Sequence, residues 1–83
     1  MYYVYLLRLE GIKNKDFYIG CTSNLKERMK QHLAGETKTT RDKNPELIYY
    51  EAYDNKYLAL KREKGIKNSG SVYMALMKRL ELK

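Results

Sequence analysis

The chain has 83 residues, and its 17 lysines and arginines against 10 aspartates and glutamates give it a formal net charge of +7. This length excludes a multidomain architecture, so we expect a single domain over residues 1–83. The charge favours polyanionic partners, most often nucleic acid, and the less favoured alternative is a generic basic surface that serves solubility.

The chain contains one cysteine and one histidine, Cys21 and His32. One cysteine excludes an internal disulfide and is typical of a reducing compartment, and one histidine excludes a histidine-rich metal site. No apolar run approaches the roughly 18 residues that a membrane span needs. The first residues lack the charged region that precedes a signal sequence. We therefore expect a cytoplasmic or nucleoid-associated protein without a membrane partner.

Two strands are predicted at the start of the chain. Residues 1–9 are rich in Tyr, Val and Leu and alternate loosely, which is typical of a strand. Residues 11–16 are polar and turn-like, and residues 17–21 indicate a second short strand. The pair predicts an antiparallel hairpin.

A helix is predicted next. Asn24 is suited to cap it, with Glu27 three residues later as in a capping box. Gly35 is well placed to end it. The predicted apolar stripe comprises Leu25, Met29 and Leu33.

The second half of the chain predicts one strand and two helices. Residues 36–45 form a polar, basic loop, and residues 47–53 form a strand with Ile48, Tyr50 and Ala52 on one face. Asp54 or Asn55 caps a helix that runs to about residue 67, and residues 68–70 break it. The final helix covers residues 71–82, with an inner stripe of Val72, Leu76 and Leu80. The order ββαβαα predicts a small α/β domain with a three-stranded, mostly antiparallel sheet.

Several polar residues fall where a core or cleft is expected. Tyr3 and Tyr5 share one face of the first strand, because side chains alternate along a strand. Tyr18 lies on the paired strand. Arg28 and His32 are i, i+4 neighbours and project together from the first helix.

A carboxylate is expected on the inner stripe of the second long helix. Glu63 lies four residues after Ala59 and three before Ile66 on this stripe. Lys61, Arg62 and Lys64 are expected to point elsewhere.

These residues, in this order and spacing, resemble the GIY-YIG nuclease superfamily, in particular small stand-alone bacterial proteins related to the nuclease half of the excision-repair incision protein. The resemblance is strongest over residues 1–67. The family's Gly-Ile-Tyr motif stands here as Tyr3-Val4-Tyr5, and its second motif is Tyr18-Ile19-Gly20, followed by Arg28 and His32. The segments Lys38 to Thr40, Tyr49 to Glu51 and Ala59 to Lys64 resemble the family's basic loop, third strand and metal-bearing helix.

The resemblance implies a metal-dependent endonuclease or nicking enzyme that hydrolyses DNA phosphodiester bonds. Glu63 would hold one Mg²⁺ or Mn²⁺, since hard cations take carboxylate oxygens and keep several waters. Either Tyr5 or Tyr18 would be the general base, and lowering a phenol pKa from 10 to about 7 corresponds to roughly 4 kcal/mol. Arg28 would pair with a phosphate oxygen, and His32 would accept a proton or hydrogen-bond the phosphate.

The implied partner is DNA, including branched or damaged DNA as in repair, with RNA and self-association left open. The expected nucleic-acid contacts are Lys26, Lys30, Lys38, Thr40, Arg41, Lys61 and Lys64. Taken singly, each site residue also has an ordinary interpretation as a sheet aromatic, a helix-surface charge or a satisfied histidine. The last fifteen residues lack the Trp or basic cluster of relatives, so the alternative is a catalytically weak or inactive nucleic-acid-binding module of the same fold.

Overall fold

The computed structural model describes residues 1–10 and 16–82. The elements in chain order are β1 (Tyr2–Leu9), β2 (Asp16–Thr22), α1 (Leu25–Leu33), the 3-10 turn η1 (Lys38–Thr40), β3 (Glu46–Tyr53), α2 (Lys56–Asn68) and α3 (Gly70–Arg79). This order confirms the small ββαβαα domain that the sequence predicts. Residues 11–15 of the expected turn lie outside the described residues.

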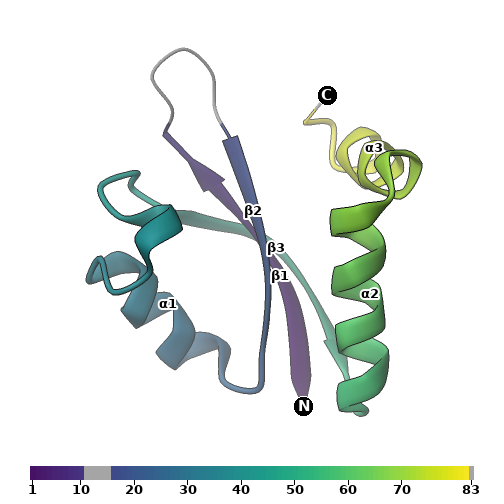
Figure 1. The fold of residues 1–83 in the computed structure, drawn as a ribbon, viewed down its shortest axis with the longest axis horizontal. Coiled ribbons are helices and arrows are strands. Elements are labelled where there is room, and N and C mark those ends of the chain that lie inside the picture. The colour runs from purple at the N-terminus through teal and green to yellow at the C-terminus, as the bar shows by residue number, and fades with distance from the viewer. Residues whose placement is uncertain (11–15, 83) are drawn as a thin grey trace.

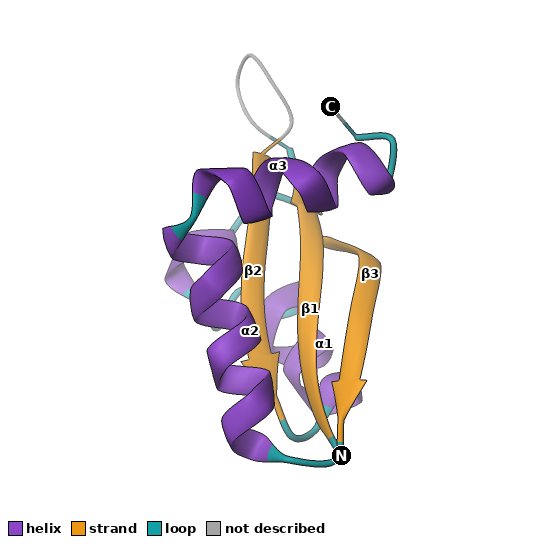
Figure 2. Ribbon diagram, turned by 90° about the vertical axis from the view of Figure 1, so that its right-hand side faces the viewer, coloured by secondary structure: helices purple, strands orange, loops and turns teal. Residues whose placement is uncertain are grey.

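The three strands form one antiparallel sheet in the order β2-β1-β3. β1 is the central strand and is covered on both faces: α1 lies on one side of the sheet, and α2 and α3 lie on the other (Figures 1 and 2). A strand covered on both faces is apolar without interruption, and accordingly Val4 to Leu7 are all buried.

Each face of the sheet has its own core. On the α1 face, Leu25 and Met29 pack against the buried side chains of Tyr5, Leu7 and Leu9. On the other face the buried residues are Val4, Leu6, Ile19, Ala59, Ile66, Leu76 and Met77. Tyr5 therefore belongs to the core on the α1 face, while α2 packs on the opposite face of the sheet.

Side-chain caps start the helices where the sequence predicts. The Asn24 side-chain oxygen accepts the backbone N–H of Glu27 at 3.1 Å, and Asn55 accepts those of Tyr57 and Leu58. Both contacts satisfy N–H groups that the first helical turn leaves unpaired. Gly35 follows α1 with a φ of +76°, a conformation that favours glycine.

The inward stripe of α1 differs from the prediction at its last position. Leu33 is 66% exposed, whereas His32 is only 1% exposed. Successive i+4 steps rotate by roughly 40° around a helix of 3.6 residues per turn, so two steps carry Leu33 away from the face that starts at Leu25. A step of seven residues returns almost to that face, and it places His32 in the interior.

The prediction that Ile48 shares a face of β3 with Tyr50 and Ala52 is wrong at Ile48. The pairing of β3 with β1 shifts between Leu6, which pairs with Tyr49, and Leu7, which pairs with Leu47, so Ile48 is an extra residue in β3. One extra residue reverses the alternation of side chains beyond it. Ile48 therefore packs into the core on the α2 side, while Tyr50 is exposed and contacts Tyr3 on the α1 face.

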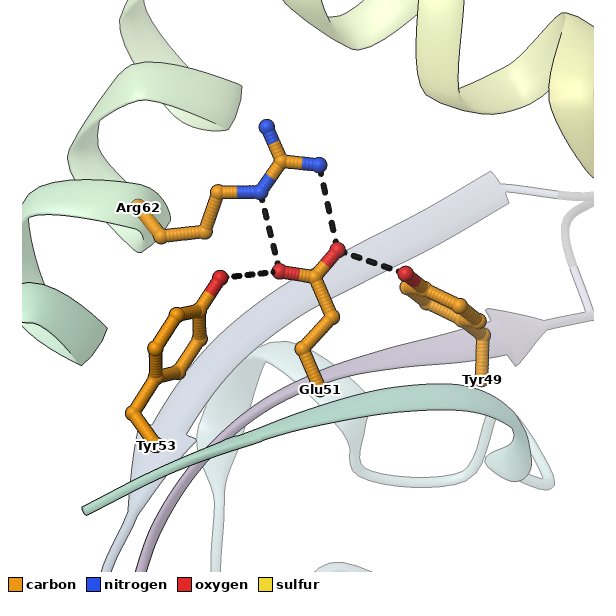
Figure 3. A network of polar contacts seen from close by, with 4 residues as sticks. All are labelled: Tyr49, Glu51, Tyr53 and Arg62. Atoms are coloured by element: carbon orange, nitrogen blue, oxygen red, sulfur yellow. Dashed lines mark hydrogen bonds and ion pairs between the residues drawn. The ribbon is translucent and has the colours of Figure 1, made fainter.

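A network centred on Glu51 joins β3 to α2 (Figure 3). The Glu51 carboxylate accepts two hydrogen bonds from the Arg62 guanidinium, at 2.9 and 3.1 Å, and one each from the hydroxyls of Tyr49 and Tyr53 at 2.6 Å. Burial opposes ionisation of this carboxylate, but the four donors prevail and lower the pKa of Glu51 to about 2. Arg62 thus faces the sheet, contrary to the prediction, because Glu51 offers it a paired acceptor.

Candidate active site

The candidate active site is built around the hydroxyl of Tyr5. This side chain comes from the central strand and is only 1% exposed. Its oxygen lies 2.8 Å from Nε2 of His32, and Nε of Arg28 donates to it at 3.3 Å. A residue from β1 and two from α1 therefore meet at one phenolic oxygen.

Gly20 provides the space in which the Tyr5 ring lies. The two residues are directly paired across β1 and β2. A Cβ built on Gly20 would stand 2.3 Å from both Cζ and Oη of Tyr5, a distance at which atoms overlap. The last residue of one tyrosine motif thus has to be glycine because the last residue of the other lies across it.

The hydrogen bonds of His32 favour one of its two neutral tautomers. The hydroxyl of Thr40 donates to the carbonyl oxygen of Thr37 at 3.4 Å and lies 2.8 Å from Nδ1 of His32. If the one proton of the Thr40 hydroxyl is directed at that carbonyl, the hydroxyl oxygen accepts the hydrogen bond from the N–H of Nδ1. His32 Nε2 is then unprotonated and accepts the hydroxyl proton of Tyr5. The chain of donors runs from Arg28 to Tyr5, His32, Thr40 and finally to the backbone.

Burial keeps the central pair neutral. It raises the pKa of Tyr5, against the lowering effect of the hydrogen bond from Arg28. Burial also lowers the pKa of His32, and the positive charge of Arg28 lowers it further. Hydrogen bonding to Tyr5 raises the pKa of Arg28, which stays charged. A neutral phenol thus faces a neutral imidazole beside a permanent cation.

Tyr18 stands beside this pair. Its ring centroid lies 6.2 Å from that of Tyr5 and 5.2 Å from that of His32. After Tyr5, whose effect is larger, Tyr18 also contributes to raising the pKa of Arg28. The ammonium of Lys67 lies 5.9 Å from the centre of the Tyr18 ring, so the second tyrosine lies between two cations.

Glu63 approaches the site from α2. Its negative charge contributes to raising the pKa values of Tyr5 and Cys21, in each case after burial. The carboxylate pairs with Lys67, one helical turn later, at 3.4 Å. Glu63 therefore lies within electrostatic reach of the Tyr5 hydroxyl, although the two residues come from opposite layers.

The donor set fits one particular kind of metal site. Among the residues that the structure describes, no group of three or more His, Cys, Asp or Glu side chains is placed to hold a metal ion. A single carboxylate fits Mg²⁺ or Mn²⁺, which complete their shells with water and substrate phosphate. It does not fit zinc, which needs several protein ligands.

Six of the seven residues predicted to contact nucleic acid are exposed, and all six are basic. The exposed members are Lys26, Lys30, Lys38, Arg41, Lys61 and Lys64. Thr40 is completely buried beneath His32 and has no surface to offer a phosphate. The sequence predicts a surface position because a polar loop carries no signal for burial; in the structure the Thr40 hydroxyl contacts Nδ1 of His32.

Three features of the site were not among the predicted site residues. Lys67 is at i+4 from Glu63, a spacing that predicts an ion pair on a helix. Gly20 was recognised only as part of a motif. The contact between Thr40 and His32 had no signal, since a loop of unpredicted shape carries it.

The structure is a small α/β domain in which two tyrosines, an arginine and a histidine lie together and a glutamate is within electrostatic reach. The family profile described as the GIY-YIG catalytic domain matches residues 1–78. The chain therefore belongs to the GIY-YIG family.

Its relatives include UPF0213 proteins. One from Clostridium perfringens is 42% identical over 81% of this chain and 71% of its own length. Others from Natronomonas pharaonis and Haloquadratum walsbyi are 39% and 35% identical over 81% of this chain, covering 78% and 74% of their own lengths. No solved structure matches this chain significantly. No helix in the described part of the chain is long and apolar enough to cross a membrane.

Proposed function

We propose that this protein is a metal-dependent endonuclease or nicking enzyme that hydrolyses DNA phosphodiester bonds, with Tyr5 as the general base. The observation that carries the proposal is the 2.8 Å contact between the Tyr5 hydroxyl and Nε2 of His32; we infer that Nε2 is the acceptor, from the contact of Nδ1 with Thr40. Tyr5 has a hydrogen bond to His32, whereas Tyr18 contacts His32 through its ring, so we assign the base to Tyr5 and not to Tyr18.

The directed hydrogen bonds support a proton relay. As the oxygen of a water attacks phosphorus, Tyr5 takes one proton from that water and passes its own hydroxyl proton to His32. The P–O bond to the leaving alkoxide breaks, and the alkoxide takes a proton from solvent. A relay of this kind needs no free phenolate, which agrees with the raised pKa of Tyr5 and the lowered pKa of His32.

Charge stabilisation comes from residues around the relay. Arg28 is fixed at the Tyr5 hydroxyl and by a hydrogen bond to Gln31 at 3.0 Å, so its guanidinium is directed before substrate arrives. A single Mg²⁺ or Mn²⁺, when bound at Glu63, would supply a Lewis acid for the phosphate and leaving oxygens. The net charge of +7 favours a nucleic-acid substrate over a neutral one.

One observation favours the alternative of a binding module with little catalysis. The carboxylate of Glu63 is already paired with Lys67, and an ammonium there competes with a divalent cation. A partly exposed pair of this kind is worth only about 0–1 kcal/mol, so a metal ion with phosphate can displace it. We therefore prefer the nuclease.

Nicking of supercoiled plasmid in Mg²⁺ or Mn²⁺ tests the proposal. The wild-type protein is expected to nick, while Tyr5→Phe and Glu63→Gln lose at least about 100-fold in rate. Equal nicking by all three proteins would show a contaminant and refute the nuclease. Salt-sensitive DNA binding without nicking would support the binding module. Selective cleavage of RNA would show that the substrate is RNA and not DNA.

A further inference from the structure

A cleft of about 450 Å³ lies beside the candidate site, between β2 and the junction of α2 with α3. Figure 2 shows this junction next to β2. Three aromatic residues, Phe17, Tyr18 and Tyr73, are among those that line it, together with Ile66 and Ser69. The volume is within the range of about 300–1,000 Å³ that small-molecule sites occupy.

Lys67 connects the cleft to the candidate site. It lines the cleft, and its ammonium lies 3.4 Å from the Glu63 carboxylate and 5.9 Å from the Tyr18 ring centre. The side chain is 47% exposed, so the ammonium remains open to a ligand from solvent. The same cation therefore faces the residues proposed for chemistry and the aromatic cleft.

We propose that this cleft binds the nucleotide next to the scissile phosphate, with its base against the aromatic residues and its phosphate on Lys67. The inference rests on the proposed function and adds a substrate subsite to it. The π-face of any nucleobase can stack on aromatic side chains, whatever the base, and an ammonium is a common phosphate partner.

The Glu63–Lys67 pair also explains how the Lys67 ammonium has a partner both without and with substrate. Without substrate, Lys67 balances the charge of Glu63. With substrate, the anionic phosphate offers the ammonium a second partner, and the carboxylate becomes available to a divalent cation. Both partners of this pair are in the last three turns of one helix, so only side-chain rotations are needed.

Binding without metal tests the subsite separately from catalysis. Single-stranded tetrathymidylate is titrated into the ¹⁵N-labelled full chain in the presence of EDTA, and amide chemical shifts are followed. The largest changes are expected at the amides of Ile19, Lys67, Ser69 and Gly70. Changes confined to the α1 face, or no binding at all, would overturn the subsite.

Two matched variants test the cation. Lys67→Gln is expected to weaken tetrathymidylate binding by about three- to tenfold and to reduce the slope of log K against log salt by about 0.7, as loss of one phosphate contact on a single strand requires. Lys78→Gln removes an exposed lysine from the last turn of α3 and is expected to stay within about twofold of wild type. Equal effects of the two variants would refute the role of Lys67.

The subsite and the nuclease fail in different experiments. If the wild-type protein does not nick plasmid but its cleft amides still respond to tetrathymidylate, the nuclease proposal fails and the subsite stands. If the protein nicks but the cleft amides do not move, the subsite alone fails. Folding of each variant is confirmed by the dispersion of its amide spectrum.

Discussion

Tyr5 and Gly20 are directly paired across β1 and β2, and the phenol ring of Tyr5 lies where a side chain of residue 20 would be. This relationship links the two tyrosine motifs physically. The first motif supplies the phenol, and the second supplies the empty space that lets the phenol reach His32 at 2.8 Å. A substitution in either motif should therefore displace the same hydroxyl, that of Tyr5.

Gly20→Ala should displace the Tyr5 ring, because the added Cβ would overlap its Cζ and Oη at 2.3 Å. We expect a loss of about 1–3 kcal/mol in the free energy of unfolding, measured by urea denaturation, together with loss of nicking. Gly65→Ala is the control, since nothing lies within 4 Å of its added Cβ in α2. A glycine-to-alanine change inside a helix should stabilise by about 0.5–1 kcal/mol. Similar destabilisation by both variants would contradict the packing argument.

Thr40→Val should remove the acceptor that holds the proton on Nδ1 of His32 while keeping the shape of the side chain. We expect a cost of about 1–3 kcal/mol in stability and at least a tenfold loss in nicking rate. Histidine ¹⁵N shifts should show loss of the Nδ1-protonated tautomer. Thr40→Ser should retain this tautomer and most activity, and the exposed Thr39→Val should resemble wild type. An unchanged tautomer in Thr40→Val would show that Thr40 does not orient His32.

The lowered pKa of His32 should make both activity and stability sensitive to mild acid. The relay needs unprotonated Nε2, so the nicking rate should be flat above pH 6.5 and fall below the folded-state pKa, which is lower than 6.5. The unfolded chain takes up the histidine proton first, so stability should be complete above pH 6.5 and decrease between 6.5 and the folded-state pKa. Melting temperatures between pH 7.5 and 5 measure this, with His32→Asn as the variant that should lack the decrease. A parallel decrease in His32→Asn would assign the effect to other groups.

Glu51→Gln should break the connection between β3 and α2. A carboxylate accepts all four hydrogen bonds from Arg62, Tyr49 and Tyr53, whereas an amide directs its own N–H groups at one pair of donors. A folded-state pKa of about 2 against 4.5 corresponds to about 3 kcal/mol of stability, present above pH 4.5 and lost as the pH falls towards 2.

The Glu51→Gln variant should therefore unfold at lower urea concentration at pH 7 and lose this acid dependence. Glu46→Gln, at the exposed start of the same strand, should change stability by less than about 0.5 kcal/mol. Equal acid sensitivity of wild type and Glu51→Gln would show that this carboxylate does not titrate as described. The pH range in which Glu51 changes the stability lies below that of His32, so the contributions of the two residues to stability can be measured in one protein.

Local patterns were sufficient for the elements and their order. Asn24 and Asn55 cap helices through contacts of two or three residues, and such contacts are determined by neighbouring sequence alone. The prediction was wrong at Ile48, because a bulge depends on how β3 pairs with β1 and not on β3 itself. The prediction that Leu33 faces the core was also wrong, because the helical repeat places His32 there and turns Leu33 towards solvent.

The sequence by itself determined the family, the ββαβαα order and the five residues proposed for chemistry, because motif spacing and side-chain periodicity are local properties. Only the tertiary structure decided how these residues work together. It buried Thr40 under His32, placed Lys67 between Glu63 and Tyr18, and laid the Tyr5 ring across Gly20. Each of these contacts joins residues through the path of a loop, the packing of a helix or the register of two strands, and none of those is written in any short stretch of sequence.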